Sequence, residues 1–215
     1  MSMSLPAEAH PDLTVGPDGV VRCGWPGMNH HDYRDYHDRE WGKPVHGETA
    51  LLERLCLEGF QSGLSWLVIL RKRPAFRTAF GGFDADRVAA LTDDDVDRLM
   101  GDESIVRNRR KIEATIQNAR ATVALRETGG LEELLWTHAP EPTPRPHRFV
   151  DVPTQTAESE LLAKRLRKAG FVQLGPTTVY AAMQACGLVD DHLAGCFRAG
   201  ASRSGSRLTG VRVSS

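Results

Sequence analysis

The sequence predicts a mostly α-helical protein with a single folded domain. Apolar residues recur at helical spacing in most segments between residues 49 and 197, and proline, glycine or capping residues stand where those segments end. The sequence shows no convincing pair of strands and no internal repeat. Of the 215 residues, 40% are hydrophobic, which is enough to build the core of one compact domain.

Four helices are expected in the first half of this domain. Residues 49–60 place apolar side chains at helical spacing, and residues 64–73 continue as a second helix. Pro74 is expected to stop that second helix, because proline lacks the backbone N–H that a helix interior needs. Asp84 is expected to cap a short third helix. Thr92 opens a fourth with T-D-D-D, a variant of the capping box.

Five further helices are expected in the second half. Pro176 suits the first turn of a helix, and Gly187 suits its C-terminal stop. Asp190 or Asp191 is expected to cap the last helix. A proline-rich loop, E-P-T-P-R-P-H, interrupts the series. The expected ranges are 105–125, 131–136, Thr156 or Ser159 to about 170, 176–187, and a final helix carrying His192 and Cys196.

Both ends of the chain are expected to lie outside the domain. Residues 1–20 are rich in Ser, Pro, Ala and Gly and are predicted to be disordered, and residues 200–215 are predicted to be a flexible tail. The folded domain is therefore expected over residues 21–199. No run is long and apolar enough for a membrane span, and the first residues lack the layout of a signal peptide. Four unevenly spaced cysteines indicate a reduced, cytoplasmic protein.

Net charge gives little indication of a nucleic-acid partner, since it is only −1. The distribution of charge is more informative. Basic residues cluster at 71–77, 107–111 and 164–168, while acidic residues cluster at 84–97. A nearly neutral protein with local basic patches can still hold a phosphate backbone on one face.

Two Cys and two His bracket the domain as a possible zinc site. Cys23 and His37 lie near its start, and His192 and Cys196 lie near its end. The second pair is spaced i, i+4, so both side chains would point the same way on a helix. Such a Cys₂His₂ set forms a closed, structural site that would join the N-terminal segment to the last helix. Spacing alone leaves open that these cysteines are small core residues.

Aromatic residues are concentrated near the start of the domain. Trp25, Tyr33, Tyr36 and Trp41 fall within 17 positions, and Trp66 follows the next helix. Flat side chains stack on nucleobases, each stack being worth about 1–3 kcal/mol. The alternative to a base-binding role is an aromatic core beside the metal, and this interpretation is favoured for Trp41. A base pocket is the favoured reading for Tyr36 and Trp66.

Glu58 stands in an apolar helix, within C-L-E-G-F-Q-S-G-L-S-W. A buried carboxylate needs a partner, because an unpaired buried charge is unfavourable. Backbone N–H groups at a neighbouring helix start could supply that partner. Alternatively, the carboxylate could accept hydrogen bonds from the amino group of a base and favour a cationic one.

A basic run, I-V-R-N-R-R-K-I, covers residues 105–112 between two predicted helices. A turn here would expose backbone N–H groups at the start of the second helix, which is a ready site for a phosphate. Side chains that would add positive charge are Arg107, Arg109, Arg110 and Lys111. A solvated basic helix face is the alternative.

Four motifs, taken in order, resemble the DNA-3-methyladenine glycosylase I family of the helix-hairpin-helix superfamily. They are R-C-G-W, Y-H-D-R-E-W-G, C-L-E-G-F-Q-S-G-L-S-W and M-Q-A-C-G-L-V-D-D-H-L-A-G-C, and the resemblance covers roughly residues 22–197. It implies a helix-hairpin-helix glycosylase fold. It also implies a monomeric, monofunctional enzyme that hydrolyses the N-glycosidic bond of 3-methyladenine in alkylated duplex DNA, releasing the base and leaving an abasic site.

The resemblance also assigns roles to residues. It implies one structural Zn²⁺ on Cys23, His37, His192 and Cys196. For the base, it implies a catalytic or base-recognising acid at Glu58, stacking by Tyr36 and Trp66 on either side of the base, and a pocket wall from Trp25 and Tyr33. For the DNA, it implies entry of Gly63 and Leu64 into the stack and binding by Arg107, Arg109, Arg110 and Lys111.

The sequence departs from the family pattern in two places. Arg110 stands where the hairpin has a glycine, and one residue is inserted between Trp25 and Tyr33. Two alternatives remain on the residues alone. One is a non-catalytic binder of alkylated DNA or nucleotides on the same zinc-stabilised scaffold. The other is a zinc-stabilised interaction module in which the aromatic residues are core.

Overall fold

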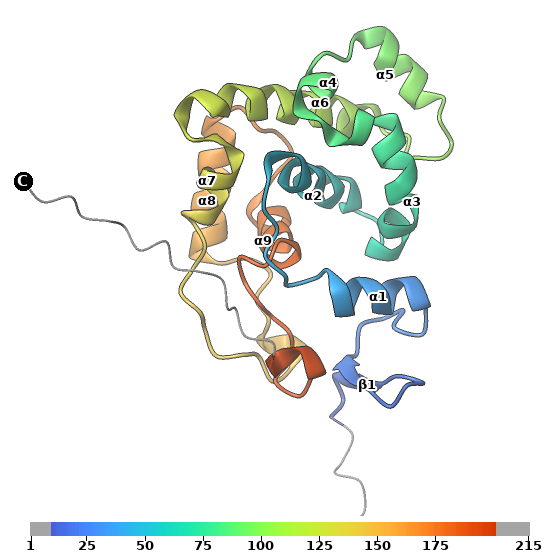
Figure 1. The fold of residues 1–215 in the computed structure, drawn as a ribbon, viewed down its shortest axis with the longest axis vertical. Helices are drawn as coiled ribbons and strands as arrows, with labels where there is room; N and C mark the ends of the chain where they lie inside the picture. Colours follow the sequence, from blue (N-terminus) through green and yellow to red (C-terminus); the bar gives the residue numbers. More distant parts are fainter. Residues whose placement is uncertain (1–9, 201–215) are drawn as a thin grey trace, which may run out of the picture.

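A computed structural model of the protein describes residues 10–200, and these residues are mostly helical, as predicted (Figure 1). The longer helices surround one central helix. The bounds are α1 His31–Arg39, α2 Glu48–Gln61, α3 Trp66–Ala79, α4 Ala85–Ala89, α5 Asp93–Met100, α6 Arg109–Leu125, α7 Gly130–Trp136, α8 Ala157–Lys168 and α9 Pro176–Ala185.

Helix α2 is the centre of the core. It packs against α3, α6, α7 and α9 (Figure 1). Leu51, Leu52, Leu55 and Leu57 are fully buried, and they are spread around the helix rather than confined to one stripe. A helix that is apolar on nearly all sides belongs in the interior. A polar side chain on α2 is therefore brought into the middle of the protein.

Several helix ends are formed by the residues expected to form them. Asp84 accepts a hydrogen bond from the backbone N–H of Arg87, and Thr92 and Asp95 form the capping box that begins α5. Thr156 caps α8 in the same way, and Pro176 occupies the first turn of α9. These local signals were readable because each depends on residues within one helical turn.

The prediction that Pro74 stops a helix is wrong. Helix α3 continues through Pro74 to Ala79. A proline inside a helix removes one backbone hydrogen bond. Burial of the following turn compensates here, because Phe76 is fully buried and lies 4.5 Å, ring centroid to ring centroid, from Phe60 of α2.

The predicted helix over residues 105–125 begins later than expected. Asn108 caps α6, which starts at Arg109, and residues 101–108 form the connection from α5. Ile105 is buried from that connection. Its burial accounts for the apolar periodicity that extended the prediction too far.

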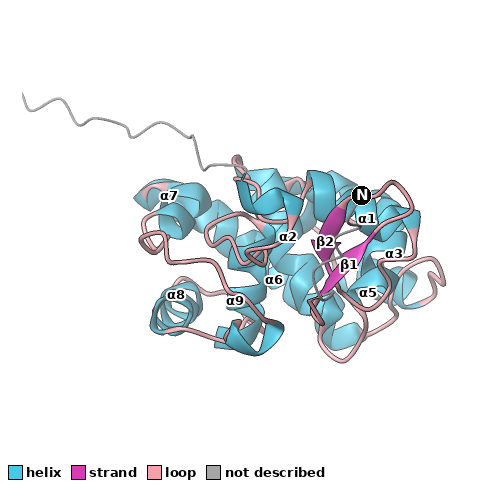
Figure 2. Cartoon of the chain, turned by 90° about the horizontal axis from the view of Figure 1, so that it is seen from below, coloured by secondary structure: helices cyan, strands magenta, loops and turns pink. Residues whose placement is uncertain are grey.

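A pair of strands is present, contrary to the prediction of none, and its first strand lies where disorder was predicted. Leu13–Val15 (β1) and Val21–Cys23 (β2) form an antiparallel pair in which Leu13 lies opposite Cys23 (Figure 2). The prediction of disorder is therefore wrong for residues 10–20, and residues 1–9 lie outside the described part. The predicted tail after residue 200 also lies outside it. The hairpin is anchored by Arg22, whose guanidinium donates to Asp18 and Asp38.

The helix expected around His192 and Cys196 is absent from the described residues. This segment is a series of turns, followed by a 3₁₀ helix at Phe197–Gly200. The carboxylate of Asp190 accepts a hydrogen bond from the backbone N–H of His192, 3.2 Å away, as in a turn rather than a helix start. The argument from i, i+4 spacing is therefore wrong. Within residues 10–200, no helix is long and apolar enough to cross a membrane.

Candidate functional site

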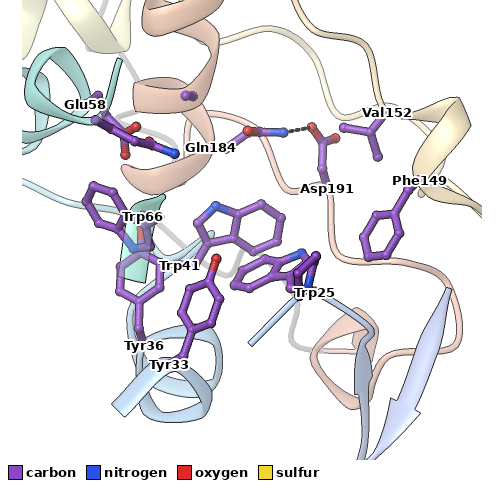
Figure 3. A pocket seen from close by; sticks show the side chains of 13 residues that line it. Trp25, Tyr33, Tyr36, Trp41, Glu58, Trp66, Phe149, Val152, Gln184 and Asp191 are labelled. Carbon is purple, nitrogen blue, oxygen red and sulfur yellow. Dashed lines mark hydrogen bonds between the residues drawn. The ribbon is translucent and has the colours of Figure 1, made fainter. Parts of the chain in front are cut away.

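A cavity of about 290 Å³ opens between α1, α2, the start of α3 and α9 (Figure 3). It brings together every aromatic residue and the acid that the sequence indicated, although they span 42 positions of the chain. Its lining consists of Trp25, Pro26, Tyr33, Tyr36, Trp41, Glu58, Gln61, Trp66, Phe149, Val152, Ala181, Gln184 and Asp191.

Glu58 is the buried acid of this cavity. Its side chain extends from the last turns of α2, next to Trp66 and Tyr36 (Figure 3), and the residue is only 6% exposed. Burial raises the pKa of Glu58 to about 8, against an opposing effect of Arg54. Within the described residues, no side chain or backbone N–H donates a hydrogen bond to its carboxyl group. Glu58 therefore carries hydrogen-bonding capacity that the protein itself leaves unused, at a cost in stability.

The aromatic residues form the walls, but not as two plates around a slot. The ring centroids of Tyr36 and Trp66 lie 5.2 Å apart at an interplanar angle of 46°. A base between two parallel rings needs them about 7 Å apart, twice the contact distance of carbon atoms. In this arrangement the two rings contact each other and leave no space for a base between them. They form one continuous surface on one side of the cavity.

Trp41 has both of the roles that were weighed for it. Its ring contacts the ring of His192, with centroids 4.6 Å apart, and it also lines the cavity. Trp25 packs edge-on against Trp41, with centroids 4.7 Å apart, and tilts against Tyr33 at 5.5 Å. The aromatic core beside the cysteines and the wall of the cavity are thus the same group of rings.

Several residues of the cavity were not predicted from the sequence. Gln184 and Asp191 come from α9 and the segment after it, and they lie within the motif M-Q-A-C-G-L-V-D-D-H-L-A-G-C, in which only the His and the last Cys were assigned a role. Phe149 and Val152 lie on and just after a 3₁₀ turn that follows the proline-rich loop. Nothing in the local sequence marks that turn, because only the folded chain brings it opposite the aromatic wall.

Three of the four predicted zinc ligands meet beneath the aromatic residues. Candidate ligand atoms of Cys23, His37 and Cys196 all lie within 4.8 Å of one another, and all three residues are buried. The Sγ atom of Cys196 is 3.6 Å from Nε2 of His37. Ligands bonded to a tetrahedral zinc lie roughly 3.5 Å apart. The donor set and this spacing both fit a zinc ion.

His192, the fourth predicted ligand, is not one of these three residues, but its ring lies directly against the cluster. Its ring meets the ring of His37 edge-on, with centroids 4.9 Å apart. Its Nε2 atom is buried and has no hydrogen-bond partner within the described residues. A buried ring nitrogen without a partner is uncommon and calls for an explanation. A metal ion would supply one.

Two carboxylates orient the histidine rings. Asp38 lies 2.8 Å from Nδ1 of His37, and Asp190 lies 2.7 Å from Nδ1 of His192. In each ring, Nδ1 faces a carboxylate that can accept its proton, and Nε2 faces the other way, toward the cysteines and the partner histidine. Metal-binding histidines are commonly held in this way.

Gly63 and Leu64 lie at the rim of the cavity. They belong to the exposed connection of residues 62–65, whose neighbours on both sides, Gln61 and Trp66, line the cavity. Gly63 has a positive φ of 81°, which a side-chain-bearing residue adopts only with strain. Leu64 is an exposed apolar side chain, with 41% of its surface accessible.

The four basic residues of the 105–112 run are in different situations. Arg107 pairs with Glu103, and Arg109 pairs with Asp97. Within the described residues the Arg110 side chain makes no ion pair, and only its backbone carbonyl accepts a hydrogen bond from Gln173. The Lys111 side chain points toward the protein, and its ammonium group bonds to backbone carbonyl oxygens instead of facing solvent.

The ammonium group of Lys111 is bonded to backbone. It donates to the carbonyl oxygens of Phe60, at 2.8 Å, and Ser62, at 2.6 Å. These carbonyls belong to the end of α2 and the connection that carries Gly63 and Leu64. The basic run and the rim of the cavity are therefore joined directly, although they lie 49 positions apart.

Both the sequence and the fold of this chain are similar to those of known proteins. The sequence profile of the Methyladenine glycosylase family matches residues 25–199. The DNA-3-methyladenine glycosylase of Haemophilus influenzae is 44% identical over 181 residues, covering 82% of this chain and 97% of that protein. A crystal structure of 3-methyladenine DNA glycosylase I is similar with a TM-score of 0.79 and 43% identity, covering 82% of this chain and 98% of that one.

A further similar structure was solved with a bound base. It is a variant of 3-methyladenine DNA glycosylase I in complex with 3-methyladenine, with a TM-score of 0.76 and 36% identity, covering 79% of this chain and 93% of that one. The family profile spans the helical domain from the first cavity tryptophan to the final 3₁₀ helix. The matched relatives are covered almost completely. The chain is therefore a member of the methyladenine glycosylase family.

Proposed function

We propose that this protein is a monofunctional DNA glycosylase that hydrolyses the N-glycosidic bond of 3-methyladenine in alkylated duplex DNA. The observation that carries the proposal is Glu58: a buried acid without a hydrogen-bond partner, facing an aromatic cavity that opens beside an exposed apolar loop. The family membership and the relatives named for 3-methyladenine support the same activity.

The connection at residues 62–65 and the start of α6 are proposed to hold the DNA. Enzymes that act on a base in a duplex rotate the nucleotide out of the stack. Leu64 is exposed beside the cavity and would fill the space that the rotated base leaves. The backbone N–H groups of Arg109 and Arg110, at the N-terminus of α6, would bind a phosphate as the hairpin of this fold class does. The Arg110 side chain, which makes no ion pair within residues 10–200, would add to that contact.

The cavity would then receive the damaged base against the surface formed by Tyr36 and Trp66. Adenine methylated at N3 is cationic, so its glycosidic bond is already weak. A cation beside Glu58 favours the ionised carboxylate, because opposite charges lower the pKa of an acid. The carboxylate would accept hydrogen bonds from the base and stabilise its positive charge until the bond breaks.

The reaction is a hydrolysis. The electron pair of the glycosidic bond leaves with the base, which departs as neutral 3-methyladenine. A water molecule adds its oxygen to C1′ of the sugar and loses a proton, leaving an abasic site. Within the described residues, no lysine lines the cavity to form a Schiff base. The proposed enzyme therefore releases the base without cutting the strand.

A single zinc ion is proposed to be part of the structure. Cys23, His37 and Cys196 would hold it, with Nε2 of His192 as the fourth ligand. A shell closed by four protein side chains supplies stability rather than chemistry. It would tie the N-terminal hairpin to the last segment beneath Trp25 and Trp41, and so support the floor of the cavity.

The test is release of free base from methylated duplex DNA, with metal content measured on the same preparation. We expect release of 3-methyladenine, retention of 7-methylguanine and about one zinc per chain. Folded, zinc-loaded protein that binds alkylated DNA without releasing base would instead identify a non-catalytic binder. Absence of both binding and release would identify a helical interaction module.

A further inference from the structure

The cavity contains a hydrogen-bond network with no role in the steps above. One carboxylate oxygen of Asp191, Oδ2, lies 2.7 Å from Nε2 of Gln184 (Figure 3). The same oxygen lies 2.7 Å from the hydroxyl of Tyr180. Gln184 and Asp191 line the cavity, and Tyr180 lies one turn earlier on α9.

This network determines which way the Gln184 amide faces. A carboxylate has only acceptors, so both of its partners must donate. Burial and the neighbouring Asp191 raise the pKa of Tyr180, which keeps its hydroxyl protonated. The amide nitrogen of Gln184 must therefore be directed at Asp191, and the amide oxygen must lie on the other side of the group. The two alternative orientations of a glutamine are not equivalent here.

The amide oxygen of Gln184 is directed into the cavity. Figure 3 shows it on the side of the amide away from Asp191, toward the part of the cavity where Glu58 lies. Within the described residues no group donates a hydrogen bond to it. The backbone of Gln184 is held as well, because its carbonyl accepts from the N–H groups of Gly42, at 3.1 Å, and Gly187, at 3.2 Å. The cavity thus presents two acceptors, one from α2 and one from α9.

We propose that Gln184 is a specificity-determining residue whose amide oxygen accepts a hydrogen bond from the exocyclic amino group of the rotated base, with Asp191 as its positioning residue. The inference rests on the proposed function. Adenine carries an amino group, a donor, at the position where guanine carries a carbonyl oxygen, an acceptor. The Gln184 amide oxygen, an acceptor that cannot turn away, pairs with the amino group and opposes the carbonyl. The network therefore selects 3-methyladenine over 3-methylguanine.

The first test replaces the acceptor without changing the length of the side chain. Duplex DNA carrying both 3-methyladenine and 3-methylguanine is incubated with wild type and Gln184→Met, and kcat/KM is measured for each base. We expect the ratio of the two values to fall about tenfold, the effect of one lost hydrogen bond. The matched control is Gln117→Met on α6, a half-buried glutamine outside the cavity, which should leave the ratio unchanged.

The second test removes the constraint on the orientation of the Gln184 amide. Asp191→Asn supplies a donor that can bond to the oxygen of Gln184, so that its nitrogen can turn into the cavity. We expect the 3-methyladenine to 3-methylguanine ratio to fall in the same direction as in Gln184→Met. Zinc content and the urea midpoint are measured in parallel, because Asp191 precedes His192. Equal losses for both bases, or an unchanged ratio in both variants, would overturn the proposal.

Binding of free 3-methyladenine separates this proposal from the proposed function. The three tryptophans of the cavity report binding by fluorescence, without turnover. Wild type that binds the base about tenfold more tightly than Gln184→Met, yet releases none from DNA, would support the role of Gln184 and refute the glycosylase. Wild type that releases 3-methyladenine while Gln184→Met binds and releases it equally well would refute the role of Gln184 and leave the glycosylase standing. Absence of both binding and release by wild type would refute both.

Discussion

The ammonium group of Lys111 lies 2.6 Å from the carbonyl oxygen of Ser62, and this contact joins the start of α6 to the rim of the cavity. The last carbonyls of a helix have no partner within the helix. Lys111 satisfies one at Phe60 and another just beyond the helix at Ser62. The segment proposed to bind the DNA backbone and the segment proposed to enter the stack therefore have a defined spacing.

We predict that Lys111→Met lowers the free energy of unfolding by about 1–2 kcal/mol, because two carbonyl groups lose a charged donor. Urea unfolding measures this change. Lys111→Arg should recover part of it. A stability equal to wild type in Lys111→Met would show that the two bonds contribute nothing to the fold.

Arg110→Met is the matched variant with the opposite outcome. Its side chain is exposed and makes no ion pair within the described residues, so stability should change by less than about 0.5 kcal/mol. Binding to duplex DNA should weaken, and the slope of log Kd against log salt should fall by about one, the effect of losing one phosphate contact. An unchanged slope would remove Arg110 from the DNA interface.

Glu58→Gln is predicted to raise stability at pH 8. Burial raises the pKa of Glu58 from 4.5 to about 8. Between these pH values the folded protein keeps a proton that the unfolded chain releases. The free energy of unfolding therefore falls as the pH rises from 4.5 to 8, and it stays at the lower value above pH 8. Glutamine removes the dependence, with a gain on the order of 4 kcal/mol at pH 8. Urea unfolding of both proteins at pH 5 and pH 8 tests it: parallel pH profiles would contradict the raised pKa.

The same substitution is predicted to reduce catalysis. The ionised carboxylate is the form that stabilises a cationic base, so kcat/KM of wild type should increase with pH toward a plateau above about pH 8. Glu58→Gln should lower kcat/KM for 3-methyladenine about 10- to 100-fold and lose this pH dependence. Wild-type excision by the variant would remove Glu58 from the mechanism.

Cys196→Ser and His192→Ala are predicted to lose zinc and to unfold at lower temperature. A structural metal site contributes directly to folding. Cys186→Ser is the control, since Cys186 is also a buried cysteine but lies outside the cluster. Zinc content by mass spectrometry and the melting temperature provide the measurement. Full zinc occupancy in His192→Ala would exclude His192 as the fourth ligand.

Leu64→Ala is predicted to impair excision from duplex DNA while leaving stability and the binding of free 3-methyladenine unchanged. The side chain is 41% exposed, and its proposed contacts form only when the duplex opens. Val68→Ala, on α3, removes an apolar side chain of similar exposure, 40%, and should not affect excision. Equal effects of the two substitutions would indicate a general loss of apolar surface rather than entry into the stack.

Features set by short stretches of chain were predictable here. Helix α5 begins at the capping box of Thr92, and α9 begins at Pro176. Features that depend on distant partners were not predictable. Helix α3 continues past Pro74 because Phe76 packs on Phe60, and the strand at Leu13 exists because it pairs with the strand at Cys23.

The candidate site divides in the same way. The sequence alone indicated Glu58, the aromatic residues and the Cys and His pairs, because a carboxylate in an apolar helix and aromatic residues concentrated in one segment are visible as patterns. The fold decided that Tyr36 and Trp66 touch each other, that Trp41 serves both the core and the cavity, and that Lys111 turns inward.

By itself, then, the sequence determined the helical class, most helix starts and the kinds of side chain that the cavity contains, since these follow from periodicity and residue chemistry within single segments. Only the tertiary structure decided the orientation of Gln184, the free nitrogen of His192 and the placement of Phe149. Each of these depends on contacts between segments far apart in the chain, and the geometry of such contacts is set by packing around α2.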